Sequence, residues 1–404
     1  MSEKPRIRLG FMPLLDAAIP IVAAEMGFAD RRGIAIDLVR ESSWANIRDR
    51  LAIGHFEAAH ALAPMPIAAA LGLTPFEAPL IAPMMLGLGG NAITVSESLW
   101  GHMRSVAPEA RVNDPRDMGR ALKAAIAARA AGGLAPLVFA VVHPYSSHNY
   151  ELRYWLAACG IDPDRDIRIA IVPPPFMPDA LASGRIDGFC VGEPWNTRAA
   201  RLASGCIILT KAAIWHNSPE KALALNAGWA AQKPDIAHAL LVAVLEAAQW
   251  CEAVENRAQL AEILGRPDRL DVPATDLLPA LRGQLGMADG LEHAVPDMLV
   301  FAANQANMPW KDHALWYLAQ MRRWGQTDPG PAEVARVTAA FRPDLYREAA
   351  KALGASAPRS DLQPVSEPGE IEGTAGVLHY APSAFFDDSR FDPAAFVATC
   401  ERAG

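Results

Sequence analysis

The sequence is poor in cysteine and contains none of the spacings that cysteine sites require. Its 404 residues include five cysteines, at positions 159, 190, 206, 251 and 400, an odd number without a C-x-x-C pair. A disulfide framework or a structural zinc site would need paired or clustered cysteines. We therefore expect free thiols, a reducing compartment and no metal site.

Long apolar runs are also missing. Ala-rich stretches such as residues 121–131 and 236–248 are interrupted by Lys, Arg, His or Glu, and they fall short of the roughly 18 uninterrupted residues that a membrane span needs. The first residues, MSEKPRIRLGF, are charged and show neither the apolar core nor the cleavage site of an export signal. These features predict a soluble, cytoplasmic protein with no membrane partner.

Motifs of nucleotide-dependent and hydrolytic enzymes do not occur. There is no G-x-x-x-x-G-K-[ST] loop, and the glycines within residues 87–90 lack the G-x-G-x-x-G spacing of a dinucleotide site. H-E-x-x-H and G-x-S-x-G are missing as well. The formal net charge of −8 argues against a protein that grips a phosphate backbone. We expect no enzyme, no cofactor and no direct contact with nucleic acid.

The chain does contain enough apolar material for two cores. Its side chains are 51% hydrophobic and 20% charged, and the chain is too long for one compact core. Strand-like and helix-like runs alternate from the start, with strands at residues 7–10 and 34–39 and helices at 19–26 and 43–53. Ser42 or Ser43 is expected to cap the second helix. This βαβα order is typical of an α/β lobe.

A second α/β segment follows. It is expected to contain strands at residues 136–142, 167–172 and 186–189 and a helix at 149–159. After about residue 211 the pattern predicts mostly helices, at residues 219–225, 236–252, 257–264 and 296–323, the last interrupted by Pro309. The Pro-rich stretch 357–368 predicts a surface connection to a final segment that packs back through residues 385–396.

Seven short segments carry a further signal. In chain order they are GFMPL (10–14), ESSWANIRD (41–49), ALAPMP (61–66), GNAITV (90–95), HNYELRYWL (148–156), DGFCVGEPW (187–195) and PEK (219–221). Together, over most of residues 5–325, they resemble the nitrate- and bicarbonate-binding receptors of bacterial ABC importers. The resemblance implies a periplasmic-binding-protein type II-like clamp of two α/β lobes. We expect residues 1–95 plus 211–404 in lobe 1 and 96–210 in lobe 2, joined by two crossovers, with the anion site in the cleft.

The resemblance also implies which residues contact the anion: Trp44, Asn91, His148, Gly192 and Lys221. Nitrate is a planar monoanion with three acceptor oxygens, so a selective site needs converging N–H groups and one positive charge. These residues offer that set. Lys221 favours nitrate or nitrite, because the bicarbonate receptors of the family place an acid at this position. We expect an unpaired Lys221 in an open, wet cleft that closes on anion capture.

Five more residues are expected to support the site, namely Ser43, Gly90, Ser146, Ser147 and Glu193. Glu193 is either structural or a partner of Lys221.

Each contact has an ordinary alternative. Trp44 could be a packing residue in a first helical turn, His148 could cap a helix, and Lys221 could be a solvated helix lysine. Asn91 stands where the transport receptors are expected to carry glutamine, and its shorter side chain would shift the amide by about one C–C bond, which could alter selectivity or recruit a water.

The missing export signal favours the cytoplasmic sensor branch of the family, of the NasS type. By the resemblance, such a nitrate/nitrite sensor holds an RNA-binding antiterminator of the NasT type and releases it on anion binding to switch on nitrate assimilation genes. Three alternatives stay open. The chain could be the substrate-binding component or domain of a nitrate or bicarbonate ABC transporter, or a receptor for bicarbonate or a sulfonate. It could also be an enzyme on the same scaffold, like the pyrimidine synthases of thiamine biosynthesis, whose histidine- and cysteine-bearing motifs are not found here.

Overall fold

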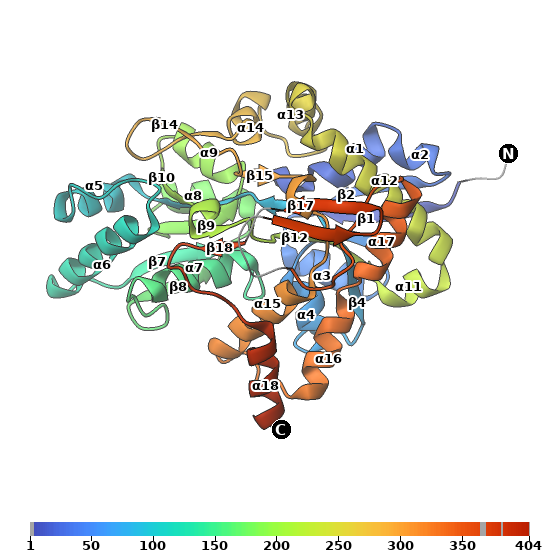
Figure 1. Ribbon diagram of the computed structural model, residues 1–404. Helices are drawn as coiled ribbons and strands as arrows, with labels where there is room; N and C mark the ends of the chain where they lie inside the picture. The colour runs from blue at the N-terminus through green and yellow to red at the C-terminus, as the bar shows by residue number, and fades with distance from the viewer. Residues whose placement is uncertain (1–3, 364–368, 381–382, 404) are drawn as a thin grey trace.

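The computed structural model describes residues 4–363, 369–380 and 383–403, which form two α/β lobes side by side (Figure 1). The sheet of the first lobe has the spatial order β2 (Ala35–Arg40), β1 (Arg6–Phe11), β3 (Ala58–Leu62), β12 (Lys221–Asn226) and β4 (Leu80–Met85). β1 is parallel to β2 and β3, whereas β12 is antiparallel to β3 and β4. Every residue of β3 and β4 is buried, as expected for strands covered by helices on both faces.

The second sheet has the order β10 (Cys206–Thr210), β6 (Asn91–Val95), β9 (Gly188–Gly192), β7 (Leu137–Val141) and β8 (Ile167–Ile171). β6 is antiparallel to both of its neighbours, and β7 is parallel to β8 and β9. Its helices are α5 (Glu97–Val106), α6 (Pro115–Ala131), α7 (Ser147–Ala158), α8 (Met177–Ala182) and α9 (Trp195–Arg201).

The chain crosses between the sheets twice, once between β4 and β6 and once between β10 and β12. The first crossing comes earlier than the predicted boundary at residue 95. β6 pairs along its whole length with β9, so residues 91–95 belong to the second sheet. The physical reason is that a strand joins the sheet that supplies its hydrogen-bonding partners, and hydropathy does not reveal those partners.

The helices of the first lobe pack around its sheet. α1 (Ala18–Glu25) contacts α12 (Pro234–Glu252) and β2, while α3 (Trp44–Ala52) lies on β3 and β1. The expected helix cap is confirmed at Ser43, whose hydroxyl accepts a hydrogen bond from the Asn46 amide at 3.2 Å. The remaining short helices are α2 (Phe28–Arg31), α4 (Pro64–Ala70), α10 (Lys211–Ile214) and α11 (Ala227–Gln232).

Two of the predicted helices are wrong. Most of residues 219–225 belong to the interior strand β12, because pairing with β3 and β4 overrides the helical propensity of its Ala and Leu residues. The long helix predicted at 296–323 begins only at Lys311, as α15 (Lys311–Arg323). Before it, Asn304 and Gln305 adopt left-handed backbone with φ of 54° and 58°, which is incompatible with a continuous helix.

The final segment packs back as predicted. β18 (Ala384–Phe385) pairs with β11 (Trp215–His216), and α18 (Pro393–Ala403) contacts α15 and α16 (Pro331–Ala340). α17 (Pro343–Ala352) and the hairpin β16 (Gly369–Gly373) and β17 (Gly376–Tyr380) precede it, and residues 364–368 of the predicted connection lie outside the described residues.

The other elements are short or peripheral: η1 (Leu15–Ala17), β5 (Leu88–Gly89), η2 (Pro174–Phe176), η3 (Val254–Asn256), α13 (Arg257–Gly265), α14 (Ala274–Leu281), β13 (Gln284–Gly286), β14 (Glu292–Ala294), β15 (Leu299–Val300) and η4 (Ala303–Gln305).

Within the described ranges, no single helix has the length and apolar character of a membrane span. One bent pair, α12 followed by Val254–Gly265 at an angle of 86°, reaches the threshold by length and composition alone.

Candidate functional site

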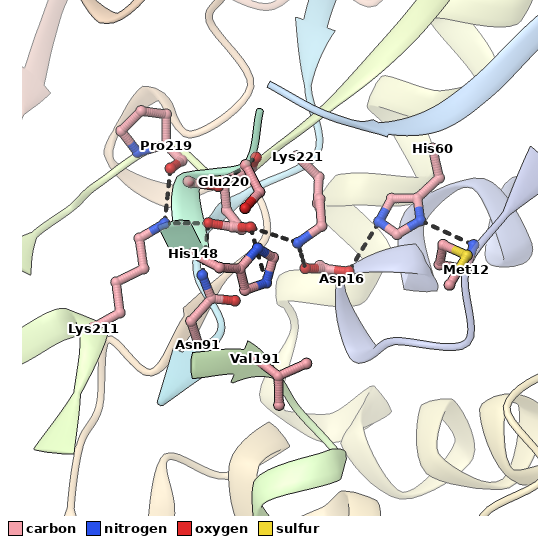
Figure 2. Close-up of polar contacts among 12 residues, drawn as sticks. Met12, Asp16, His60, Asn91, His148, Val191, Lys211, Pro219, Glu220 and Lys221 are labelled. Atoms are coloured by element: carbon pink, nitrogen blue, oxygen red, sulfur yellow. Dashed lines mark hydrogen bonds and ion pairs between the residues drawn. The ribbon is translucent and has the colours of Figure 1, made fainter. Parts of the chain in front are cut away.

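The residues predicted to contact an anion come together where the two lobes meet. Asn91 and Gly192 are cross-strand partners on β6 and β9 of the second sheet. Lys221 begins β12 of the first sheet, and its Nζ lies 5.5 Å from the centre of the Trp44 ring. His148 lies in the first turn of α7, with Nε2 3.5 Å from Glu220 Oε1. Segments far apart in the chain therefore meet at one place (Figure 2).

The first turns of two helices contribute residues to this site. Trp44 is the first residue of α3 after its cap Ser43, and His148 is the second residue of α7 after its cap Ser146, whose hydroxyl accepts from the Asn149 amide at 3.1 Å. The N-terminal end of a helix carries partial positive charge and unsatisfied amides. The caps therefore orient two N–H-bearing rings at the ends of helices that favour anions.

Lys221 is fully buried, but it is not unpaired. Its ammonium donates to Asp16 Oδ2 at 2.8 Å and to Glu220 Oε1 at 2.6 Å. Burial by itself lowers the pKa of Lys221, but the two carboxylates outweigh it and the pKa is raised. The expectation of an unpaired lysine is therefore wrong, because two acids of the same lobe balance its charge.

The lobes are also closed on each other. The Leu15 amide donates to the Glu193 carbonyl at 2.8 Å, and the Trp195 indole donates to the Pro13 carbonyl at 2.9 Å. Ser147 Oγ adds a longer hydrogen bond of 3.5 Å to the Glu220 carbonyl. The structure therefore shows the lobes in contact with each other and not the expected open cleft.

A second buried lysine completes what we call the charge cluster, formed by Asp16, Glu151, Lys211, Glu220 and Lys221. Lys211 Nζ lies 2.6 Å from Glu220 Oε2 and 2.8 Å from Glu151 Oε1. It also donates to the Pro219 carbonyl at 2.8 Å. Figure 2 shows Glu220 between the two lysines, which reach it from opposite sides. The cluster therefore joins η1, α7, α10 and the start of β12.

Charge within the cluster is unevenly distributed. Burial raises the pKa of Asp16, yet the Lys221 ammonium and His60 together bring it to about 2. The pKa of Glu220 is likewise well below its usual value, because its two lysine neighbours outweigh the effect of burial. For Glu151, burial and the nearby Glu220 outweigh Lys211, and the pKa is raised to about 8. At pH 7 the carboxyl group of Glu151 is therefore mostly protonated.

The two histidines beside the cluster are neutral at pH 7. Burial lowers the pKa of His148 to about 3, and it lowers that of His60 despite the neighbouring Asp16. His60 is fully satisfied, since Nδ1 accepts from the Met12 amide at 3.3 Å and Nε2 lies 2.9 Å from Asp16 Oδ1. His60 therefore fixes the Asp16 carboxylate that holds Lys221.

At this site, buried ring nitrogens on two side chains have no hydrogen-bond partner among the described residues. They are the Trp44 indole Nε1 and the two ring nitrogens of His148, one of which carries the proton in the neutral ring. Buried N–H groups are almost always hydrogen-bonded in folded proteins. Unsatisfied donors on opposite lobes, beside a buried ammonium, are suited to receive the oxygens of a small anion.

Asn91 makes contacts within the protein that the sequence did not predict. Its Nδ2 donates to Glu220 Oε2 at 2.8 Å and lies 3.4 Å from Glu151 Oε2, while Oδ1 has no partner among the described residues. The amide donors are engaged with the charge cluster. Asn91 therefore orients Glu220 in this structure, and its free atom is an acceptor.

The glycines and Glu193 line the same region. A Cβ on Gly192 would lie 3.3 Å from Asn91 Oδ1 and 3.2 Å from Leu14 Cδ2, so a side chain there would crowd the site. Gly90 accepts at its carbonyl from the Glu193 amide. The Glu193 carboxylate accepts from the Thr197 amide at 3.2 Å, and burial raises its pKa to about 7. Glu193 therefore has the structural role that was one of its two predicted roles. It is not the partner of Lys221, which pairs with Asp16 and Glu220.

Sequence reasoning missed Asp16, His60, Glu151, Lys211 and Glu220 as members of the site. Four of them had a signal, because Glu151 and Glu220 lie inside the family-like segments and Asp16 and His60 lie next to one. Lys211 had no such signal. In the described part of the chain, no group of three or more His, Cys, Asp or Glu side chains is placed to hold a metal ion.

A closed pair of α/β lobes with two crossings and a buried polar site between them is the architecture of periplasmic-type solute-binding proteins. The crystal structure of the periplasmic nitrate-binding protein NrtA from Synechocystis PCC 6803 has the same fold, with a TM-score of 0.84, 29% identity and 99% of each chain covered. The expected fold class is thereby confirmed.

The chain belongs to the NMT1-like family, whose family model matches residues 1–265. It is 33% identical to the nitrate/nitrite binding protein NrtA of Nostoc sp. over 398 residues, which cover 97% of this chain and 84% of the relative. It is also 31% identical to the bicarbonate-binding protein CmpA of Synechococcus elongatus over 413 residues, 97% of this chain and 85% of that protein. These relatives are binding proteins, in keeping with the missing catalytic motifs.

Proposed function

We propose that this protein is a solute-binding receptor for nitrate or nitrite, held in the cleft between its lobes. The observation that carries the proposal is the set of buried, unsatisfied N–H groups on Trp44 and His148, which come from opposite lobes and lie beside the Lys221 ammonium. A planar monoanion with three acceptor oxygens matches such donors, and it requires no metal.

Lys221 supports nitrate or nitrite over bicarbonate as the ligand of this receptor. Nitrate offers no proton to donate, so its oxygens depend on N–H donors. Relatives that bind nitrate and nitrite and one that binds bicarbonate are both about one third identical to this chain. Lys221, with its third N–H beyond the bonds to Asp16 and Glu220, favours a pure acceptor ligand.

The relatives favour a transport role. The two relatives named above are a nitrate/nitrite binding protein and a bicarbonate-binding protein, and the chain also resembles a nitrate import ATP-binding protein, NrtC of Synechocystis sp.. The substrate-binding component of an ABC importer is therefore the better supported form of the proposal. The sensor role, with an RNA-binding antiterminator of the NasT type as partner and a cytoplasmic location, stays a prediction. No relative named here carries it.

Substituting Trp44→Phe tests the anion site, since it removes one N–H and keeps the ring. Loss of a charge-assisted hydrogen bond should weaken nitrate binding about tenfold, equivalent to about 1.4 kcal/mol. Isothermal titration with nitrate, nitrite, bicarbonate and chloride provides the measurement. Trp100→Phe is the matched control, because the Trp100 indole on α5 is also buried without a partner and α5 packs against α6.

Failure of the parent protein to bind either nitrate or nitrite would refute the proposal. Equal weakening by Trp44→Phe and Trp100→Phe would place the ligand elsewhere. A second experiment distinguishes the transport role from the sensor role. The protein, with and without nitrate, is mixed with membranes that contain a nitrate-type permease–ATPase and, separately, with a purified NasT-type antiterminator. A transport component associates with the permease, and a sensor holds the antiterminator only without nitrate.

A further inference from the structure

The charge cluster contains more acids than bases. Asp16, Glu151 and Glu220 face Lys211 and Lys221, and the side chains of all five are at most 3% exposed. His60 and His148 add no charge at pH 7 because burial lowers the pKa of each. With every carboxyl group ionised, the cluster would therefore carry a net negative charge before any anion arrives.

Glu151 is the least compensated of the three acids. Its Oε1 lies 2.8 Å from Lys211 Nζ, but the contact is not aligned as a hydrogen bond, and the atom has no other partner among the described residues. Its Oε2 accepts a long hydrogen bond of 3.4 Å from Asn91 Nδ2, which also donates a shorter one of 2.8 Å to Glu220. Lys211 and Asn91 thus both hold Glu220 more closely than Glu151.

Among the described residues, Lys211 is the cation that contacts Glu151. The titratable groups that interact with Glu151 come from four elements: Lys211 on α10, Glu220 before β12, Cys190 on β9 and Tyr317 on α15. Burial and the Glu220 carboxylate raise the pKa of Glu151 to about 8 in spite of Lys211. A second negative charge brought into this region would raise it further.

We propose that Glu151 is a positioning residue that makes anion binding depend on a proton: its carboxyl group must be protonated for a monoanion to occupy the site. The inference rests on the proposed nitrate-binding function and deepens it. With Glu151 protonated, two carboxylates balance two lysines, and the anion is the only added charge. With Glu151 ionised, the anion and Glu151 would be two uncompensated negative charges in one buried region, which is strongly unfavourable.

The dependence of nitrate affinity on pH tests this directly, because nitrate does not titrate near neutrality. If Glu151 has a pKa of about 8 without the anion and a higher pKa with it, nitrate binding weakens as the pH rises. The Kd for nitrate should then increase about tenfold from pH 7 to pH 9. The isosteric Glu151→Gln is always neutral and should show the same Kd at both pH values. Asp276→Asn is the control, since Asp276 is a buried carboxylate outside the charge cluster that pairs with Arg198 and Arg201. It should keep the slope of the parent.

Proton uptake on the parent protein gives a second test that needs no variant. Titration with nitrate at pH 8, in buffers with different heats of ionisation, should show about half a proton taken up per nitrate bound. Glu151→Gln should take up none. Nitrate binding that is independent of pH, or a Glu151→Gln variant that keeps the slope, would overturn the proton dependence and leave the receptor intact. Absence of nitrate binding at pH 7 would instead overturn the proposed function itself.

Discussion

At the residue scale, the site depends on how each charge is compensated. Lys221 was expected to await an anion as its counter-charge, but Asp16 and Glu220 already pair with it. Asp16 is in turn held by His60, whose other nitrogen is fixed by the Met12 amide. A buried lysine that is paired in this way stays charged, and its remaining N–H is directed by the pairing. The charge and the donor geometry of the site therefore depend on the acids around the lysine as much as on the lysine.

Asp16 should make the stability of the protein depend on pH at the acidic end. Its pKa is about 2 in the folded protein and about 4 in an unfolded chain. Its contribution to the free energy of unfolding, about 2 kcal/mol, is thus present above pH 4 and is lost as the pH falls towards 2. Asp16→Asn should be less stable than the parent at pH 6 in urea denaturation, and this difference should shrink at pH 3. A constant difference would contradict the assignment.

At the element scale, helix caps place the two unsatisfied rings. Ser43 and Ser146 begin α3 and α7, and the rings of Trp44 and His148 follow within the first turn. Sequence reasoning found the first cap and the helix that follows it, because a capping serine before an amphipathic segment is a local signal. It failed for β12, whose partners β3 and β4 lie more than 130 residues earlier in the chain.

Ser146→Ala should affect both stability and binding. The variant loses the hydrogen bond that Ser146 accepts from the Asn149 amide, which costs about 1 kcal/mol in stability. Because His148 lies two residues after the cap, nitrate affinity should fall as well. Ser96→Ala is the control: Ser96 caps α5 in the same way, accepting from the Leu99 amide, and α5 does not carry a site residue. It should lose similar stability in denaturation and keep the parent's affinity in titration.

At the scale of the whole molecule, the C-terminal segment around Phe385 contacts elements of both lobes. The Phe385 ring stacks on Trp215 with 4.7 Å between centres and lies 4.8 Å from the ring of Tyr154 on α7. Tyr154 also donates to Asp387 at 2.9 Å. Since α7 carries His148 and α15 carries the neighbouring Trp316, this segment stabilises the closed arrangement of the lobes.

Phe385→Ala should therefore weaken nitrate binding without touching the site. The ring is half-buried, so the loss of packing should cost about 2 kcal/mol in the free energy of unfolding. In the variant, the closed arrangement of the lobes lacks this contact and is less populated. The apparent Kd for nitrate should therefore rise several-fold. Calorimetric titration and urea denaturation measure the two effects, with the exposed Phe176→Ala as control. An unchanged Kd would show that the Phe385 contact does not act on the cleft.

The sequence by itself determined the local elements and the family. Strands and helices over residues 6–53, the Ser43 cap, the docking of the final segment and the two-lobed fold all follow from short-range patterns and from motifs in a specific order. The tertiary structure decided which sheet β6 and β12 join, and it brought Asp16, Glu151, Lys211 and Glu220 to Lys221. Local patterns depend on neighbours in the chain, whereas strand pairing and charge compensation depend on neighbours in space, such as Asp16 and Lys221, which are 205 residues apart in the chain.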